Sequence, residues 1–281
     1  MGAKTTSGFG KVAAKKGSVS LAVYDFSKVA DVKAWLLKRP ASNVETLSAT
    51  AVVDEKDFVI DADFVLKSSL LVRSSAFDPQ DYSKDIKKIA SVQMKSLNDY
   101  VIPGTTLKGV IRNQAINICN ALGKKSATIV DAIFGFADNN RSSKKGSLIA
   151  EETYMKDFVK DYAQTRNKID RFTGATVDNA LFTNVPIWQD DKDKASLHIR
   201  LVLKKYETWQ AGLLLFILKD LWTGQVAVGG EKSIGRGTLQ GINAKLQFAN
   251  KTICIQDFAG FAVDDKESLE TLAKAFVDYE G

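Results

Sequence analysis

Alternating apolar and polar residues predict the strands of this chain, and apolar residues at helical spacing predict its helices. The segment "FVIDADFVLKSSLLVRSS" (58–75) alternates over most of its length and predicts a long strand, bent near its middle. "ASLHIRLVLKKYE" (195–207) and "TLQGINAKLQF" (238–248) predict two further strands. Between these two lies "TWQAGLLLFILKDLWTG" (208–224), which predicts an apolar helix.

A second helix is predicted after a Pro-Gly turn. "YVIPGTTLKGVIRNQAINICNALG" (100–123) indicates a strand end, the turn, and a helix closed by Gly123. Residues 126–155 then predict a short helix, a flexible loop and a strand. From Phe58 onwards the order is β-α-β-β-α-β, which predicts an α+β fold with a ferredoxin-like (RRM-type) core, whose sheet is a common RNA-binding surface. The apolar residues expected on one face of the second helix are Leu107, Val110, Ile111, Ile116, Ile118 and Leu122.

The remaining segments divide the chain into two expected units. Residues 1–50 contain a glycine- and lysine-rich loop, a strand (18–26) and a helix (27–39) that Pro40 stops, so this unit begins in mid-fold. Residues 51–281 form the main domain. Within it, residues 156–190 are expected to be a polar excursion with few core residues. The chain from Asp264 to Gly281 predicts a last helix.

Composition and charge narrow the class of ligand. The formal charge is +6 with a pI of about 9.1, and Lys and Arg gather beside glycine, serine and threonine in the loops. This favours a polyanion, with nucleic acid first and a phosphorylated small molecule second; solvated surface charge is the alternative. With two cysteines and one histidine, a zinc site is not expected, and His198 is interpreted as an ordinary strand residue. No signal peptide or membrane span is predicted, so we expect a reducing, cytoplasmic location.

The segment "AVGGEKSIGRGTLQG" (227–241) is a basic glycine loop. Its spacing is not that of an ATP P-loop, and it precedes a strand, so we expect it to lie along an extended phosphate backbone through its N–H groups. A flexible hairpin turn is the alternative. A second loop of similar form, "GAKTTSGFGKV" (2–12), supplies Lys4 and Thr5. In the loop 227–241, the candidate binding residues are Gly229, Gly230, Lys232, Ser233, Gly235, Arg236 and Gly237.

Two more segments are candidates for binding a phosphate backbone. The helix start in "IPGTTLKGVIRNQ" (102–114) favours an anion, and Lys108 and Arg112 share one helical face. In "NKIDRFTGATVDNALFTNVPIW" (167–188), basic and aromatic residues interleave as a nucleic-acid contact requires. The alternatives are an ordinary capped helix and a packed β-hairpin whose aromatics face the domain. The candidate residues are Thr105, Thr106, Lys108, Arg112, Lys168, Arg171 and Phe172, with Phe182 and Trp188 as further aromatics.

Together, "PGTTLKGVIR", "NKIDRFTGAT...ALF" and "GGEKSIGRG" occur in an order that resembles the RAMP superfamily, the backbone subunits of type III CRISPR effector complexes. The resemblance covers residues 58 to about 248. It implies a subunit that stacks with others along CRISPR guide RNA, and a β-hairpin "thumb" that kinks the guide–target duplex. It also implies that Lys108 and Arg112 contact the guide backbone, that Gly229 to Gly237 lie along it, and that Ile169 to Trp188 supply the thumb, within an insertion of about 156–190.

Some members of this family also cut target RNA with an aspartate about fifteen residues before the Pro-Gly turn. Counting back from Pro103 gives Lys87 to Ile89, where no acid stands, and Asp85 is only near it. This departure favours binding without cutting, without a tightly bound cofactor. The alternative is a target-RNA endoribonuclease that uses Asp85, as a base or through Mg²⁺. The acidic residues of the unplaced segment, which solvation alone also explains, are Asp78, Asp81, Asp85 and Asp99.

The resemblance also implies partners. These are guide RNA, target RNA and other RAMP and effector subunits, in a ribonucleoprotein complex for antiviral defence. In this family a glycine loop normally ends a domain, so residues 1–50 resemble the tail of one unit placed before a second. They are hypothesised to complete a neighbouring subunit. A nucleotide- or phosphometabolite-binding enzyme is a third hypothesis, disfavoured because neither a P-loop nor a Rossmann fingerprint is present.

Overall fold

The computed structural model of the chain describes most of the main domain and part of the N-terminal unit. The candidates Lys4, Thr5 and Asp85, together with Asp78 and Asp81, lie outside the described residues. The described residues are 20–40, 43–46, 54–74, 89–137, 143–155, 157–191, 194–257 and 262–281.

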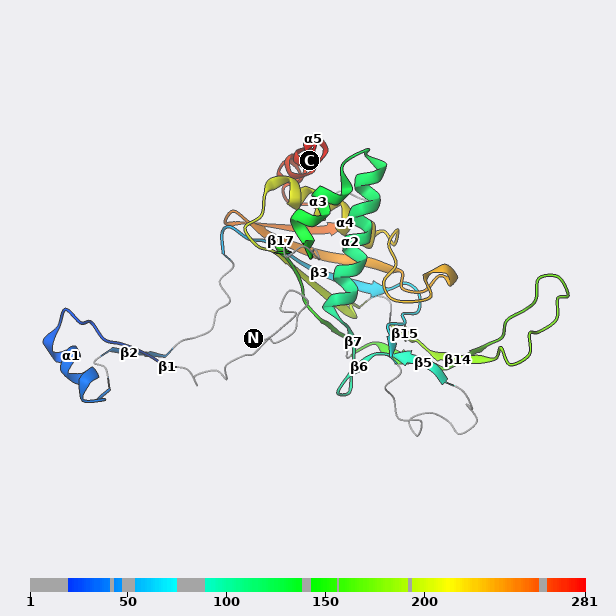
Figure 1. Ribbon diagram of the computed structural model, residues 1–281, viewed down its shortest axis with the longest axis horizontal. Coiled ribbons are helices and arrows are strands. Elements are labelled where there is room, and N and C mark those ends of the chain that lie inside the picture. Colours follow the sequence, from blue (N-terminus) through cyan, green and yellow to red (C-terminus); the bar gives the residue numbers. More distant parts are fainter. Residues whose placement is uncertain are drawn as a thin grey trace.

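A six-stranded antiparallel sheet with the order β10-β16-β3-β17-β18-β19 forms the centre of the main domain. Helix α2 connects β3 to β10, and helix α4 connects β16 to β17, on the same face of the sheet (Figure 1). The first four strands therefore have the ferredoxin-like order, which confirms the predicted fold class. The elements are β3 (Phe58–Leu66), α2 (Gly104–Ala121), β10 (Leu148–Ala150), β16 (Leu197–Leu203), α4 (Thr208–Trp222), β17 (Leu239–Phe248), β18 (Lys251–Asp257) and β19 (Ala262–Val263).

The strand alternation builds the core because every second side chain of β3 faces the two helices. Phe58, Ile60 and Phe64 are fully buried there. Helix α4 is apolar on nearly all sides because a further helix, α5 (Lys266–Asp278), covers its other side. Gly212 of α4 makes this possible: a Cβ at this position would lie 2.1 Å from the carbonyl oxygen of Leu272 in α5.

The buried stripe of α2 differs from the predicted one. Leu107, Val110 and Ile111 are buried as expected, but the stripe continues through Ala115 and Cys119. These positions follow Leu107 and Ile111 at four-residue spacing, and small side chains fill them because the helix lies close to its neighbours. Ile116 and Ile118 are only partly buried, and Leu122 is 49% exposed.

Small sheets fill the connections around the core. Helix α3 (Ser126–Phe134) follows α2 as predicted, but the paired strands β8 (Gly135–Ala137) and β9 (Ser143–Lys145) lie where a flexible loop was expected. Residues 157–190 contribute few residues to the hydrophobic core, as expected, but β14 pairs with β5 and places Thr183, Asn184 and Val185 in buried positions. The other strands are β4 (Arg73–Ser74), β5 (Ile89–Gln93), β6 (Lys95–Ser96), β7 (Asp99–Ile102), β11 (Thr153–Met155), β12 (Val159–Asp161), β13 (Gln164–Arg166), β14 (Phe182–Val185) and β15 (Ile187–Gln189).

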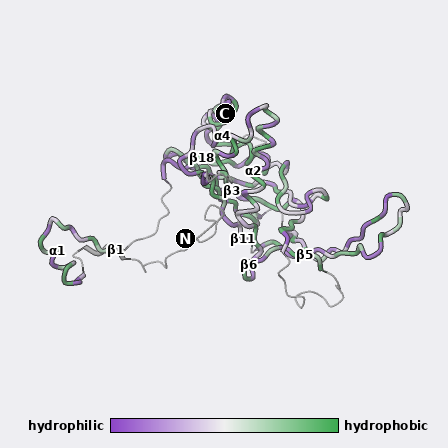
Figure 2. The backbone as a smooth tube through the Cα atoms, viewed as in Figure 1, coloured by the Kyte–Doolittle hydropathy of each residue, from purple (hydrophilic) through white to green (hydrophobic). Residues whose placement is uncertain are grey.

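The loop between β13 and β14 projects from the main domain (Figure 1). Its backbone carries both hydrophilic and hydrophobic positions along its length (Figure 2). The N-terminal unit consists of β1 (Ser20–Val23), α1 (Val29–Leu36) and β2 (Asn43–Thr46), and its two strands pair with each other. None of the described helices has the length and hydropathy that a bilayer crossing requires.

The contact between α4 and α5 generates a stability prediction. Gly212→Ala should destabilise the fold by about 1–3 kcal/mol, because the new methyl group overlaps the α5 backbone. Gly109→Ala in α2 is the matched control, since a Cβ there meets no atom within 4 Å. That change should stabilise the protein by about 0.5–1 kcal/mol through helix propensity. Urea unfolding of the three proteins measures both effects, and equal shifts in the two variants would contradict the packing argument.

Candidate functional site

The carboxylate of Glu231, in the glycine loop between α4 and β17, is the centre of the candidate site. Its Oε2 atom accepts hydrogen bonds from Arg166 NH2 at 2.5 Å and from Arg236 Nε at 2.8 Å. Its Oε1 atom accepts from Asn184 Nδ2 at 2.7 Å and from Arg73 NH2 at 3.5 Å. These donors come from β13, the loop itself, β14 and β4. One carboxylate therefore ties the glycine loop to the base of the projecting β13–β14 loop.

Arg236 faces the protein interior, although the sequence predicted a direct ligand contact. Its side chain is 3% exposed. Besides the bond to Glu231, NH1 donates to Ser69 Oγ at 2.7 Å and NH2 donates to Gln164 Oε1 at 2.5 Å. A buried guanidinium requires such partners, and here all of its nitrogens have them. Arg236 therefore holds the loop in place through these hydrogen bonds. The expectation that its side chain lies on the surface is wrong.

Two glycines of the loop have positive φ and pack tightly. Gly229 has φ +87° and Gly237 has φ +80°, and a Cβ on Gly237 would lie 1.8 Å from the carbonyl oxygen of Val228. The N–H groups of Gly230 and Gly237 donate at 2.7 Å to the carbonyls of Leu71 and Ser69. The N–H groups of Gly230 and Gly237 therefore already have partners within the protein, and they are not free to bind a phosphate backbone as expected.

The exposed part of the loop is a short tip. Lys232, Ser233 and Ile234 form a 3-10 turn, η3 (Lys232–Ile234), followed by Gly235 with φ +85°. A Cβ on Gly235 would meet no atom within 4 Å, so the positive φ, and not lack of space, is what favours glycine at this position. The tip therefore offers Lys232 and Ser233 to the surroundings.

The electrostatics of this junction leave an excess of positive charge. Burial alone would raise the pKa of Glu231, but the hydrogen bonds and charges of Arg166 and Arg236 lower it below its ordinary value. One ionised carboxylate thus faces three guanidinium groups. Arg73 is 60% exposed and Arg166 is 28% exposed. The sequence analysis missed Arg73 and Arg166, because both stand outside the glycine-rich motif and meet it only through folding.

The tip of the β13–β14 loop is ordered by its own backbone. Asp170 Oδ1 accepts hydrogen bonds from the N–H groups of Phe172 at 2.7 Å and Thr173 at 3.1 Å. These bonds lower the pKa of Asp170. The Phe172 side chain is 100% exposed. Lys168 and Arg171 are exposed beside it.

The projecting loop is shorter than the predicted thumb. It spans residues 167–181 between β13 and β14. Phe182 begins β14, where its ring lies 5.4 Å from the Arg166 guanidinium. Trp188 lies in β15 opposite Lys160 of β12 and belongs to the base of the domain. Of the segment expected as a thumb, Ile169 to Trp188, the part from Phe182 onwards is thus largely strand, and the projecting part ends at Leu181.

The first turns of α2 form a second basic site. A hollow of about 210 Å³ is lined by Thr105, Lys108, Gly109, Arg112 and Phe134. Lys108 Nζ donates to the carbonyl of Leu148 at 3.1 Å, and Arg112 lies 3.5 Å from Asp131. Burial lowers the pKa of Lys108, and the charges of Arg112 and Lys145 lower it further. Thr105 is exposed, whereas Thr106 is partly buried and its N–H donates to Pro103.

The two basic sites are linked by hydrogen bonds through the segment after β3 and Gln93 of β5. Leu71 accepts the hydrogen bond from Gly230, and the next residue, Val72, donates to Gln93 Oε1 at 2.7 Å. Gln93 Nε2 in turn donates to the carbonyl of Val101 at 3.0 Å, in the strand β7 that leads into α2. The structure thus brings the glycine loop and the β13–β14 base together and sets the α2 hollow beyond an intervening segment.

The face of the main sheet away from the helices carries a charged network. His198 Nδ1 lies 2.8 Å from Asp63, its Nε2 lies 3.3 Å from Asp61, and Arg200 NH1 lies 2.6 Å from Asp61. The pKa of His198 is raised to about 9, mainly by the hydrogen bond to Asp61 and also by Asp63. Burial alone would lower it. Ionic side chains stand here where RRM sheets carry stacking aromatics. His198 is thus an ion-paired strand residue.

Comparison with known proteins identifies a family. The family model described as the RAMP superfamily matches residues 56–240, which is more than half of the chain. None of the curated proteins matches it. The matched range contains the start of α2, the projecting loop and the glycine loop with Glu231 and Arg236.

The Glu231 junction generates a pH-dependent stability prediction. Glu231→Gln should cost about 3 kcal/mol at neutral pH, because it leaves Arg236 buried without its counter-charge. A carboxyl group with a lowered pKa stabilises the fold above its unfolded-state value and loses this effect as pH falls through the folded value. The difference between wild type and variant should therefore shrink below pH 4.5, the ordinary value of the group.

Urea unfolding at several pH values between about 3 and 8 checks this, with Glu267→Gln as the control because Glu267 is exposed in the first turn of α5. A difference that stays constant down to the lowest pH would contradict the assigned role of the carboxylate.

Proposed function

The chain belongs to the RAMP superfamily, and from this membership we propose that it is a guide-RNA-binding backbone subunit of a type III CRISPR effector complex. The family itself points to a CRISPR-associated, RNA-binding role. The finer assignment is supported by one observation above all: the positive excess at the Glu231 junction, next to an exposed and rigidly held loop tip.

The junction suits a phosphate backbone. The guanidinium groups of Arg73 and Arg166 are oriented by the same carboxylate, and guanidinium groups bind phosphate oxygens with paired hydrogen bonds. Lys232 adds a third charge from the exposed tip. These contacts carry no base information, so we expect binding that depends on salt and not on sequence.

The α2 hollow would hold a second part of the same backbone. Lys108 already donates one hydrogen bond to the protein and keeps further N–H groups for a ligand. Gly109 has no side chain in the way, and Arg112 stands four residues along the same face as Lys108. Because the segment after β3, β5 and β7 lie between this hollow and the glycine loop, the two sites would hold different phosphates of one strand.

The projecting loop would act on the guide–target duplex. Phe172 is fully exposed at a tip whose backbone is fixed by Asp170, with Lys168 and Arg171 beside it. An exposed ring on an ordered tip stacks on bases at little entropic cost, and the two cations pair with the flanking phosphates. We assign this loop, residues 167–181, the role of the thumb.

The proposed subunit binds RNA and does not cut it. The acid expected about fifteen residues before Pro103 is missing from the sequence, and Asp85, the nearest candidate, lies outside the described residues. The proposed partners are guide RNA, target RNA and neighbouring subunits of the complex.

Removal of three basic side chains tests the guide-binding surface. The variant Arg73→Ala, Lys108→Ala, Lys232→Ala should bind single-stranded RNA at least about tenfold more weakly than wild type. The slope of log affinity against log salt should become shallower by about 2, since each lost phosphate contact contributes about 0.7. Fluorescence anisotropy at several salt concentrations measures both quantities.

The control for this experiment removes three exposed lysines of α4 and α5, Lys219, Lys266 and Lys274, which leaves the net charge of the two variants equal. If both variants lose affinity and salt dependence to the same extent, net charge alone explains the binding and the assigned surface is wrong.

Phe172 separates guide binding from duplex distortion. In the complex assembled with guide and target RNA, Phe172→Ala should leave guide affinity within about twofold of wild type, because the ring meets bases only in the duplex. The same change should remove the local unstacking of the duplex, because the stacking of a base on the ring, worth about 1–3 kcal/mol per base, is lost. A 2-aminopurine in the target strand reports this as lost fluorescence.

Leu181→Ala is the matched control, since Leu181 is also exposed but lies at the base of the loop. Unchanged 2-aminopurine fluorescence with Phe172→Ala would remove the ring from this role.

A further inference from the structure

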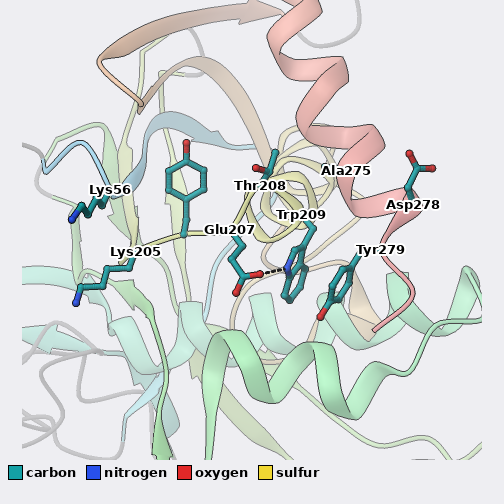
Figure 3. A pocket seen from close by; sticks show the side chains of 9 residues that line it. Lys56, Lys205, Glu207, Thr208, Trp209, Ala275, Asp278 and Tyr279 are labelled. Atoms are coloured by element: carbon teal, nitrogen blue, oxygen red, sulfur yellow. Dashed lines mark hydrogen bonds between the residues drawn. The ribbon is translucent and has the colours of Figure 1, made fainter.

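A hollow of about 800 Å³ lies where β3 begins, at the other end of that strand from the glycine loop. The segment before β3, the residues that join β16 to α4 and the end of α5 line this aromatic hollow (Figure 3). The family match ends at residue 240, so the α5 wall, with Ala275, Asp278 and Tyr279, lies outside the matched range. The aromatic hollow shares no lining residue with the α2 hollow.

Aromatic side chains form the walls of this hollow and are held from behind. Trp209 stacks on Tyr279, with ring centroids 4.1 Å apart and an angle of 3° between the rings (Figure 3). Tyr206 packs against Phe58 at 5.6 Å and against Phe248 at 6.4 Å. A flat ring that enters the hollow would therefore meet aromatic surfaces that are already in position. The volume lies in the range of small-molecule sites.

The rim of the hollow carries charges of both signs, and the two signs are separated. Lys56 and Lys205 stand on the Tyr206 side. Asp278 stands on the other side, next to Tyr279 (Figure 3). Neither ammonium group has a hydrogen bond or an ion pair to a residue in the described ranges. A ligand that matches this rim carries an anion at one end and hydrogen-bond donors at the other.

The carboxylate of Glu207, which also lines the hollow, already has a partner within the protein. Its Oε2 atom accepts a hydrogen bond from Trp209 Nε1 at 3.0 Å (Figure 3). Glu207 is also the residue that caps the start of α4. Its place is thus explained by the helix and by the aromatic wall. The charged groups that the fold leaves for a ligand are the two ammonium groups and the carboxylate of Asp278.

The residues at the rim break two local rules of structure. Lys205 has φ +49°, a conformation that favours glycine or asparagine. Asp278 is the last residue of α5, where the helix dipole disfavours a carboxylate. Residues that are unfavourable in their local structure concentrate at functional sites. Both of these side chains line the same hollow.

We propose that the aromatic hollow binds one nucleotide. The base lies against the aromatic walls, the phosphate lies between Lys56 and Lys205, and the N–H groups of the base face Asp278. A nucleotide joins a flat ring with N–H donors to an anion, which is the combination that the walls and the rim require. Guanine suits Asp278 best, because two adjacent N–H groups of its edge can donate to one carboxylate. A free nucleotide and the end of an RNA strand both present this chemistry.

Isothermal titration calorimetry of the full chain with guanosine monophosphate (GMP) tests the site. A Kd of about 1 mM or tighter is expected. Uridine monophosphate (UMP) should bind at least about fivefold more weakly, because uracil offers the carboxylate one N–H group and not two. The variant Lys56→Ala, Lys205→Ala should bind GMP at least about tenfold more weakly, because the phosphate loses both cations. Lys219→Ala, Lys274→Ala is the control of equal net charge, with both lysines exposed on α4 and α5.

Two more variants separate binding from folding. Asp278→Ala should bind GMP no better than UMP, and it should be at least as stable as wild type in urea, since it removes a carboxylate from a helix C-terminus. Thr208→Trp should abolish GMP binding, because Thr208 is exposed and the new ring fills the hollow without touching the core. Its urea unfolding should match that of wild type. GMP binding that survives Thr208→Trp, or an equal loss in the lysine control, overturns the proposal.

The two sources of the nucleotide are distinguished by displacement of bound GMP. A short RNA whose 5′ end is a phosphorylated guanosine, followed by uridines, should displace GMP more strongly than GMP displaces itself if the hollow takes the end of a strand. Weaker or equal displacement assigns the hollow to the free nucleotide. Both results support the site, whereas wild type that gives no heat with GMP overturns it.

The outcome is independent of guide binding. The variant Arg73→Ala, Lys108→Ala, Lys232→Ala should bind GMP like wild type, because its substitutions lie at the Glu231 junction and in the α2 hollow. In turn, Thr208→Trp should bind unphosphorylated single-stranded RNA like wild type. GMP binding that is lost with the three basic side chains would place GMP on the guide-binding surface, and the aromatic hollow would have no such role.

Discussion

The geometry of the candidate site depends on the ionic contact between Glu231 and the three arginines around it. Arg236 can be buried only because Glu231, Ser69 and Gln164 accept its hydrogen bonds. Glu231 itself has φ +57°, a conformation that costs a non-glycine residue about 1 kcal/mol or more. Hydrogen bonds from charged donors offset that cost. These hydrogen bonds join the glycine loop, the base of the β13–β14 loop and the segment after β3.

Much of the fold could be predicted because the strands β3, β16 and β17 each bury one face against α2 and α4, and alternation records this directly. Strand β18 was not predicted. Its hairpin with β17 turns at Ala249 and Asn250, both with positive φ, and lacks the Asn-Gly or Asp-Gly pair that signals such a turn. The strands of residues 156–190 were missed because each is only three or four residues long and is buried by distant partners.

The sequence could predict which loop forms the candidate site, but not which of its side chains face the surface. The glycine motif located the loop, but in the sequence Lys232 and Arg236 are equivalent basic residues. Folding separates them: Lys232 is exposed, and Arg236 bonds to Ser69, 167 positions away along the chain. The reverse holds for Arg73 and Arg166, which the motif does not contain and which folding brings to it. Long-range hydrogen bonds decide which cations face a ligand, and local patterns do not contain them.

The topology also places two surfaces at opposite ends of β3. The glycine loop precedes β17, and the segment with Arg73 follows β3, so the basic junction lies where β3 ends and β17 begins. A hollow of about 800 Å³ is lined by Lys56 before β3, by the residues that join β16 to α4, and by the end of α5, so it lies where β3 begins (Figure 3). A nine-residue strand spans about 30 Å between these ends. The two surfaces are therefore far apart, and side chains of one can be replaced without touching the other.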